Sequence, residues 1–180
     1  VNWIAISCPN TPVRVTAKTR YTQKESTATV HFGAPTPSLD CEHSVDHTYP
    51  WRHITREQVE HALQQLSGER FQLPPLYSAK KVEGVRAYEF ARAGEEVELK
   101  RALINIYEME ILSLEMPLLR LRVRCSKGTY IRSLAHEIGQ ALDSGAHLSG
   151  LRRTRSGGFT VEKAHELQNF LEKLHECETK

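Results

Sequence analysis

The chain has 180 residues, of which 39% are hydrophobic and 26% are charged, and its formal net charge is +2. This length and composition fit one ordinary globular domain. No apolar run reaches the roughly 18 residues of a membrane helix, and no signal-peptide pattern opens the chain. We therefore expect an intracellular protein with no membrane partner, in the cytoplasm or in an organelle such as the mitochondrion.

The first half predicts a strand, a long loop and a helix. Residues 27–32 are short and β-rich, and the stretch that follows Gly33 is rich in proline and aspartate, which excludes regular structure. Residues 55–58 have the form of a capping box, and apolar residues then recur at helical spacing until Gly68. A helix is therefore expected from about residue 55 to residue 67.

The second half predicts two strands and a second helix. Residues 103–114 and 118–125 are strand-like, with Met116-Pro117 as the turn between them. After residues 126–129, a helix follows whose buried stripe is expected to comprise Ile131, Leu134, Ala135, Ile138, Ala141 and Leu142. The mildly acidic residues 161–180 are interpreted as a solvated helix face.

Basic charge is concentrated in this second half. In the second strand, apolar residues alternate with Arg120, Arg122 and Arg124, so one face of the strand is apolar and the other is cationic. Residues 120–155 contain eight Lys or Arg against only Glu137 and Asp143. Such a surface suits a phosphate backbone, although a solvated sheet face would have the same pattern.

The cysteines and histidines do not indicate a metal site. The four cysteines are widely separated and form no CxxC pair, so we expect neither zinc nor a disulfide framework. His43 and His47 have the i,i+4 spacing of a metal pair on a helix. They lie in a proline-rich loop, however, and are interpreted as solvated loop residues.

Three segments carry a resemblance to a known family. Residues 74–89 (PPLYSAKKVEGVRAYE), 126–135 (SKGTYIRSLA) and 146–157 (AHLSGLRRTRSG) resemble, in order and spacing, the PPxYSAxKxxGxRAYE, KGTYIRSLA and HLxxLRRTxxG segments of TruB-type tRNA pseudouridine synthases. The similarity runs from about Thr27 to about Ala164. Residues 1–164 are therefore expected to form a synthase-like domain without its N-terminal segment, and residues 165–180 a C-terminal helix or tail without a separate RNA-binding module.

The resemblance implies a partial domain of the α+β class, with a mixed, largely antiparallel central sheet flanked by helices and an RNA-binding cleft across it. No metal and no organic cofactor are implied. Enzymes of this family flip a uridine out of the tRNA T-loop, break its N-glycosidic bond and rejoin the base through carbon. By resemblance, Arg132 is the partner of the catalytic aspartate, Tyr77 and Lys80 lie at the cleft, and Leu151 packs near the base.

The expected partner is a structured RNA, either the T-loop of tRNA or ribosomal RNA, and a ribonucleoprotein particle is a further candidate. The side chains expected to contact RNA are basic or aromatic and lie in the second half of the chain: Arg120, Arg122, Arg124, Lys127, Tyr130, Arg152, Arg153 and Arg155.

Two departures from the family pattern concern catalysis. The family's aspartate lies in a GTLDPxAxG segment, and residues 3–8 resemble the strand that follows it, so the aspartate is expected outside this chain. Ser26 occupies the position of the tyrosine that stacks on the base, and a hydroxymethyl group cannot supply a stacking energy of roughly 1–3 kcal/mol. Asp40 is a weak candidate for the missing carboxylate, because its segment resembles one that is not catalytic in the family.

The sequence therefore predicts an RNA-binding member of the family that, as given, is not catalytically competent. One alternative is an active synthase whose aspartate lies upstream of Val1, and another is a silent scaffold or assembly factor on a ribosomal particle. For the chain as given, we expect the guanidinium of Arg132 to point at the vacant carboxylate position near Trp3 and to recruit a substitute acceptor such as a backbone carbonyl, a phosphate or a water.

Overall fold

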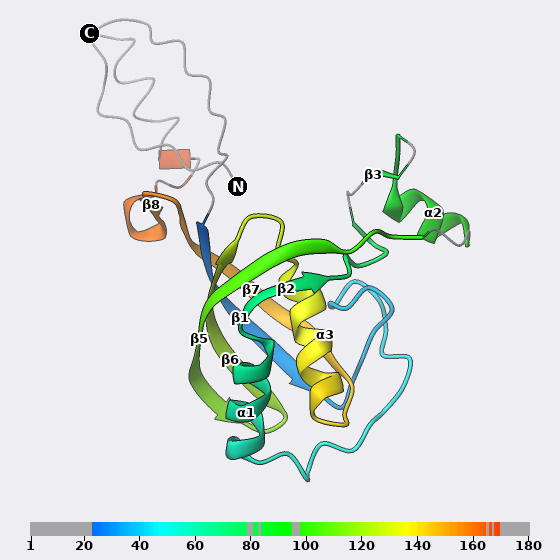
Figure 1. The fold of residues 1–180 in the computed structure, drawn as a ribbon, viewed down its shortest axis with the longest axis vertical. Coiled ribbons are helices and arrows are strands. Elements are labelled where there is room, and N and C mark those ends of the chain that lie inside the picture. The colour runs from blue at the N-terminus through cyan, green and yellow to red at the C-terminus, as the bar shows by residue number, and fades with distance from the viewer. Residues whose placement is uncertain are drawn as a thin grey trace, which may run out of the picture.

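The computed structural model describes residues 23–78, 81–82, 84–94, 98–164, 166 and 168–169. Two α-helices pack on a curved sheet, and a small hairpin with a third helix projects from one side (Figure 1). In chain order the elements are β1 Gln23–Phe32, α1 Arg56–Leu66, β2 Gly68–Gln72, β3 Lys81–Val82, β4 Val85–Arg86, α2 Ala87–Ala93, β5 Ala102–Glu115, β6 Leu118–Ser126, α3 Ile131–Ala141, β7 Ala146–Ser156, β8 Phe159–Thr160 and the 3-10 turn η1 Val161–Lys163.

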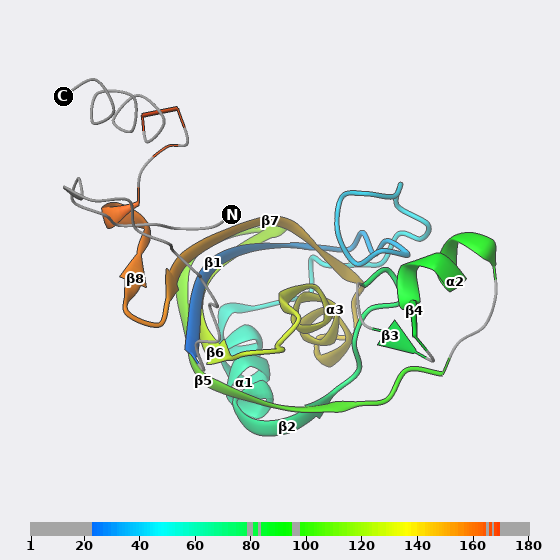
Figure 2. The same ribbon diagram turned by 90° about the horizontal axis from the view of Figure 1, so that it is seen from above.

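The main sheet has six strands in the order β2-β5-β6-β1-β7-β8, and every neighbouring pair is antiparallel. Strand β1 is central and pairs with β6 on one side and β7 on the other. The sheet curves around α1 and α3, so both helices lie on its concave face (Figure 2). We call this the helix face of the sheet and the opposite side the open face.

Strand β6 shows why the sheet has one buried face. Its residues alternate strictly between exposed and buried, with Leu119, Leu121 and Val123 almost wholly buried against the helices. Because successive side chains of a strand point to opposite sides, the intervening arginines lie on the open face. The alternation predicted from the sequence is confirmed.

The capping box predicted before the first helix is confirmed. The hydroxyl of Thr55 accepts a hydrogen bond from the Gln58 backbone, and the Gln58 side chain accepts one from the Thr55 backbone. The helix buries Val59, Ala62 and Leu63 against the core. Two N–H groups at the start of the helix are thereby satisfied, which fixes where it begins.

Helix α3 also forms where predicted, but one residue of the predicted buried stripe is exposed and two others are buried in addition, Ser133 and Gly139. Ala141 is exposed, whereas Gly139 is buried. A Cβ added at Gly139 would lie 2.7 Å from the backbone nitrogen and from the Cβ of Ala146, so the helix contacts β7 through its glycine. This close approach turns the far side of the last turn, including Ala141, away from the core.

The predicted α+β class with a largely antiparallel sheet is confirmed. The strands expected at residues 27–32, 103–114 and 118–125 are present as β1, β5 and β6, and residues 33–54 form the expected long loop. Three strands of the main sheet, β2, β7 and the two-residue β8, were not predicted as strands. In β7, the run of arginines and a β-bulge at each of two positions mask the two-residue period.

Candidate functional site

Arg132 is held at the start of α3 by contacts to the end of β2. The side chain of Gln72 accepts a hydrogen bond from the Tyr130 backbone nitrogen at 2.9 Å and donates one to the Tyr130 carbonyl oxygen at 3.2 Å. The hydroxyl of Ser133 donates to the Leu73 carbonyl oxygen at 2.8 Å. Gln72 is only 1% exposed. The residues on both sides of Arg132 are therefore fixed to one strand end.

The guanidinium of Arg132 joins two loops. Its Nη1 donates to Asp40 Oδ2 at 2.8 Å and to the Ser38 carbonyl oxygen at 3.3 Å. Its Nη2 donates to the Tyr77 carbonyl oxygen at 2.8 Å. The side chains of Arg132 and Asp40 are 22% and 25% exposed, so this is a partly buried ion pair.

The guanidinium of Arg132 was expected to point at a vacant carboxylate position near Trp3 and to recruit a substitute acceptor. Trp3, the expected neighbour of its guanidinium, lies outside the described residues. Two of the acceptors are main-chain carbonyl groups, of the kind expected for a guanidinium without its usual partner. The third is the carboxylate of Asp40, which the sequence analysis did not connect with Arg132.

Asp40 is fixed by its own loop as well as by Arg132. Its Oδ1 accepts a hydrogen bond from the Glu42 backbone at 3.0 Å, and its backbone forms a bridge to Leu148 of β7. Partial burial alone would raise the pKa of this carboxyl group. The Glu42 N–H, the Ser38 hydroxyl and the Arg132 guanidinium outweigh that effect and hold the pKa of Asp40 below its ordinary value. Asp40 is therefore ionised at neutral pH.

Tyr77, which the resemblance places at the cleft, contacts Arg132 through its carbonyl oxygen. Its ring packs on the ring of His43 with centroids 4.5 Å apart and planes tilted by 50°. The Nδ1 atom of His43 is buried and has no hydrogen-bond partner among the described residues. Lys80, the other expected cleft residue, lies outside the described residues. Among the described residues, His43 is thus held by its ring contact with Tyr77 and not by a hydrogen bond.

Ser26 lies on the helix face of the central strand. It is 5% exposed and stands opposite Val123 of β6 and Arg153 of β7. Leu151 stands opposite Ala28 of the same strand and is 50% exposed. The position of Ser26 is thus set by hydrogen-bonded strands on both sides.

The expected RNA-contacting residues are divided between the two faces of the sheet. Arg120, Arg122 and Arg124 lie on the open face, and Arg152 joins them because it stands opposite Thr27. Arg153 stands opposite the buried Ser26 and therefore lies on the helix face, on the side of Arg132. The basic residues do not form one continuous surface.

Acidic residues of β5 reduce the cationic charge of the open face. Arg122 pairs with Glu110 at 3.1 Å and Arg124 pairs with Glu108 at 3.2 Å. These acids lie before residue 120, outside the segment whose charges were counted in the sequence. Counting charge along one segment could not reveal them, because strand pairing brings them in from a neighbouring strand.

The remaining expected RNA contacts lie around the ends of β6, α3 and β7. Lys127 is exposed in the turn before α3, and Tyr130 is the residue at the N-terminal boundary of that helix. The Nε of Arg155 donates to the Gly157 carbonyl oxygen at 2.8 Å, within the turn that follows β7.

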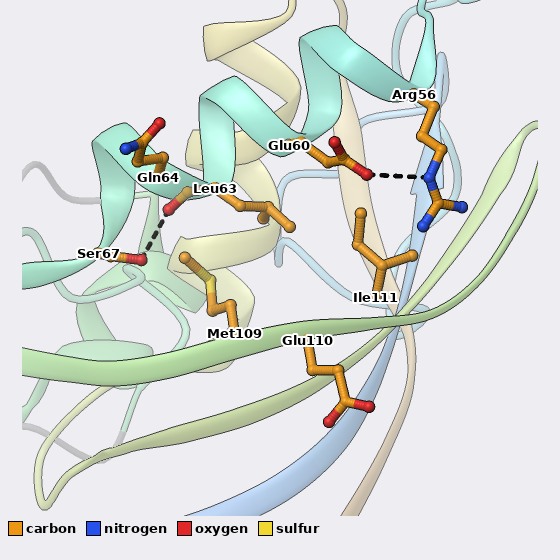
Figure 3. Close-up of a pocket in the computed structure, with 8 residues that line it drawn as sticks. All are labelled: Arg56, Glu60, Leu63, Gln64, Ser67, Met109, Glu110 and Ile111. Carbon is orange, nitrogen blue, oxygen red and sulfur yellow. Dashed lines mark hydrogen bonds and ion pairs between the residues drawn. The ribbon is translucent and has the colours of Figure 1, made fainter.

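Two hollows of the described surface lie away from Arg132. One, of about 400 Å³, lies between α1 and β5 and is lined by the ion-paired Arg56 and Glu60 and by the apolar side chains of Leu63, Met109 and Ile111 (Figure 3). The other, of about 470 Å³, lies on the open face around Arg120 and Arg152. The described part of the chain has no group of three or more His, Cys, Asp or Glu placed to hold a metal ion. It also has no helix long and apolar enough to cross a membrane.

Sequence reasoning missed two residues that define this site. Asp40 was considered only as a substitute nucleophile, although its proximity to Arg132 arises from the bridge between its loop and β7. Gln72 gave no signal, because a single glutamine in an unpredicted strand resembles a surface residue. Its near-complete burial distinguishes it only in the folded chain.

Comparisons with known proteins agree with this architecture. Residues 5–131 match the model of the TruB family pseudouridylate synthase N-terminal domain, and residues 132–180 match that of the tRNA pseudouridylate synthase B C-terminal domain. The tRNA pseudouridine synthase B of Bacteroides fragilis is 50% identical over 94% of this chain and 72% of its own length. That of Phocaeicola vulgatus is 49% identical over 97% of this chain and 74% of its own length.

Solved structures show the same fold. A Cbf5-Nop10-Gar1 complex matches with a TM-score of 0.61 and 28% identity, over 86% of this chain and 37% of that chain. An H/ACA RNP bound to a substrate RNA containing 2'-deoxyuridine matches with a TM-score of 0.58 and 25% identity, over 87% and 36%. The present chain thus spans about a third of the length of these structural relatives. On the family models and the curated relatives together, this chain belongs to the TruB family of pseudouridine synthases, which modify tRNA.

Proposed function

We propose that this chain binds the T-loop region of tRNA on the helix face of its sheet, around Arg132. The observation that carries this proposal is the fixed guanidinium, which joins the loops of Asp40 and Tyr77 beside β7. Arg153 lies on the same face and adds positive charge where a backbone phosphate would lie. An RNA substrate is consistent with the intracellular location expected from the sequence, in the cytoplasm or in an organelle.

The 180-residue chain, as given, is proposed to bind RNA without converting uridine to pseudouridine. Its sequence contains no GTLDP segment. Asp40 is the one carboxylate that bonds to Arg132 among the described residues, and a second hydrogen bond from its own loop restrains it. Ser26 cannot stack on a base. Binding requires less, because phosphate contacts and shape recognition do not depend on these groups.

A second candidate is an active synthase, and the ion pair of Arg132 with Asp40 is the observation that favours it. The family mechanism pairs an arginine with its catalytic aspartate, and Asp40 is ionised and within 2.8 Å of Arg132. In this case Asp40 itself, or an aspartate supplied by a GTLDP segment, would act on the uridine. A silent role within a ribonucleoprotein particle is a third candidate, because one of the solved relatives is an H/ACA RNP.

One set of assays separates these candidates. The purified chain is incubated with a T-loop hairpin, and binding and pseudouridine formation are measured separately. We expect binding and no pseudouridine. Turnover that is lost on Asp40→Asn while hairpin binding is kept would assign a role in catalysis to Asp40, directly or through Arg132. Turnover restored by fusing a GTLDP-bearing segment from a curated relative would identify an active synthase. Failure to bind the hairpin more tightly than an unstructured RNA of equal length would contradict the RNA-binding proposal itself.

A further inference from the structure

The open face of the sheet contains a pocket that the proposed uridine site does not use. Its volume is about 470 Å³, and its lining comes from three neighbouring strands and the turn η1. The residues important here are Thr27, Thr29, Arg120, Gly150, Arg152 and Glu162. Because Arg120 alternates with the buried Leu119 and Leu121, the pocket lies on the opposite side of the sheet from α3 and Arg132.

Arg120 differs from the other two arginines of β6 in having no acidic residue directly opposite it on β5 and no ion pair with that strand among the described residues. Arg122 and Arg124 form ion pairs with Glu110 and Glu108, whereas the residue opposite Arg120 on β5 is Ser113. Within the part of the chain that the structure describes, the Arg120 side chain makes no ion pair and no hydrogen bond. Its charge and its five N–H donors are therefore available to a ligand.

The floor of the pocket supplies further donors and space. Thr29 stands opposite Arg120 on one side and Gly150 on the other, and Thr27 stands between Arg122 and Arg152. The hydroxyls of Thr27 and Thr29 donate no hydrogen bond within the described residues. At Gly150, a Cβ would lie 3.3 Å from Thr29 Oγ1, so the glycine keeps this part of the floor open.

One acidic residue lies at the rim of the pocket. Glu162 is exposed, and its pKa is lowered by its own backbone N–H, by the Thr160 hydroxyl and, to a smaller extent, by the nearby Arg152 guanidinium. Glu162 therefore offsets part of the charge of Arg152 and leaves Arg120 as the less neutralised cation. Two arginines against one glutamate in the lining favour an anionic ligand that tolerates one carboxylate at its edge.

We infer that this pocket binds a phosphate group of an RNA backbone at a point away from the T-loop. Guanidinium groups and hydroxyls recognise phosphate oxygens through directional hydrogen bonds, with Arg well suited to a bidentate contact. The pocket is on the far side of the sheet from Arg132, so a hairpin bound at Arg132 does not fill it, whereas a whole tRNA extends further. This inference rests on the proposed RNA binding and adds a second, sequence-independent contact.

The test compares a T-arm hairpin with the full-length tRNA over a range of salt concentrations. Arg120→Ala should weaken binding of the full-length tRNA and reduce its salt slope by about 1, because one phosphate contact is lost. Binding of the hairpin should not change. Glu162→Gln should act in the opposite direction on the full-length tRNA. Arg56→Ala, which removes one exposed positive charge from α1, is the matched control and should leave the salt slope unchanged.

The possible results separate failure of the phosphate site from failure of the proposed T-loop site. If the hairpin binds and Arg120→Ala has no effect on the full-length tRNA, the phosphate site is wrong while the T-loop site stands. If Arg120→Ala weakens both RNAs equally, the pocket belongs to the same contact as Arg132 and the inference is again wrong. Loss of full-length binding with an unchanged melting temperature of the variant protein supports the site. If neither RNA binds the unaltered chain, both proposals fall together.

Discussion

At the scale of single residues, Asp40 determines how Arg132 is held. Replacing it by asparagine keeps the shape but removes the charge, so a partly buried guanidinium loses its carboxylate. Hydrogen bonds to charged groups contribute about 1–3 kcal/mol, and we expect Asp40→Asn to lower the free energy of unfolding by that amount in urea titrations at pH 7. Asp46→Asn, an exposed change in the same loop, should have a much smaller effect.

The same substitution should lose its effect in acid. The pKa of Asp40 is lower in the folded chain than in the unfolded one, so its contribution is complete above the ordinary carboxyl pKa of about 3.9 and disappears as pH falls through the folded value. The difference between the two proteins should therefore be constant from pH 5 to 8 and shrink below pH 4. A difference that instead grows in acid would show that Asp40 is not a stabilised carboxylate.

His43 provides a second test at this scale. Because its buried Nδ1 has no described partner, the ring contact with Tyr77 is its main interaction. His43→Ala should lower the free energy of unfolding by about 0.5–1.5 kcal/mol or more, whereas His43→Phe should preserve it, since the ring stays and an unsatisfied nitrogen is removed. His47, whose ring is 6.3 Å from that of Tyr49, gives matched control variants. Equal losses in His43→Phe and His43→Ala would indicate a polar role for the imidazole.

At the scale of elements, the sequence predicted the features that depend on interactions between residues close together in the chain. The capping box before α1 and the alternation of β6 are complete within a few residues, and both were read correctly. Strand β7 was missed because bulges at Ser149 and Thr154 interrupt its period. The pairing of Arg122 with Glu110 was missed for another reason, since it depends on the register between two strands. The ion pair of Arg132 with Asp40 likewise joins residues 92 positions apart.

Two adjacent arginines of β7 lie on opposite faces of the sheet by the ordinary alternation of a strand, and this leads to a prediction. Arg152 faces the open side and Arg153 the helix side, so RNA bound around Arg132 can reach only the second. We expect Arg153→Ala to weaken binding of a T-loop hairpin roughly tenfold, which corresponds to about 1.4 kcal/mol. Arg152→Ala should leave hairpin binding unchanged and affect only the full-length tRNA. Fluorescence anisotropy at fixed salt would measure both, and equal losses on the hairpin would contradict the division between faces.

At the scale of the whole molecule, the two family models meet between residues 131 and 132, yet one core spans both. Strand β1 lies between β6 and β7, and the core includes Ala146 and Leu148 from beyond that boundary together with Leu119 and Leu121 from before it. We therefore expect a single cooperative transition, with coincident curves from far-ultraviolet ellipticity and tryptophan fluorescence. Separately expressed residues 1–131 and 132–180 should not fold alone. Two resolved transitions would show independent units.

The two hydrogen bonds between the Gln72 side chain and the Tyr130 backbone have a consequence for hydrogen exchange. Amide hydrogens at the start of a helix usually lack a partner within the helix and exchange rapidly with solvent. The Tyr130 amide instead donates to a side chain that is almost completely buried. Its exchange should therefore be as slow as that of core amides, and it should accelerate only when the end of β2 separates from α3. This single amide thus reports how often the backbone around Arg132 opens, in the free chain and with RNA bound.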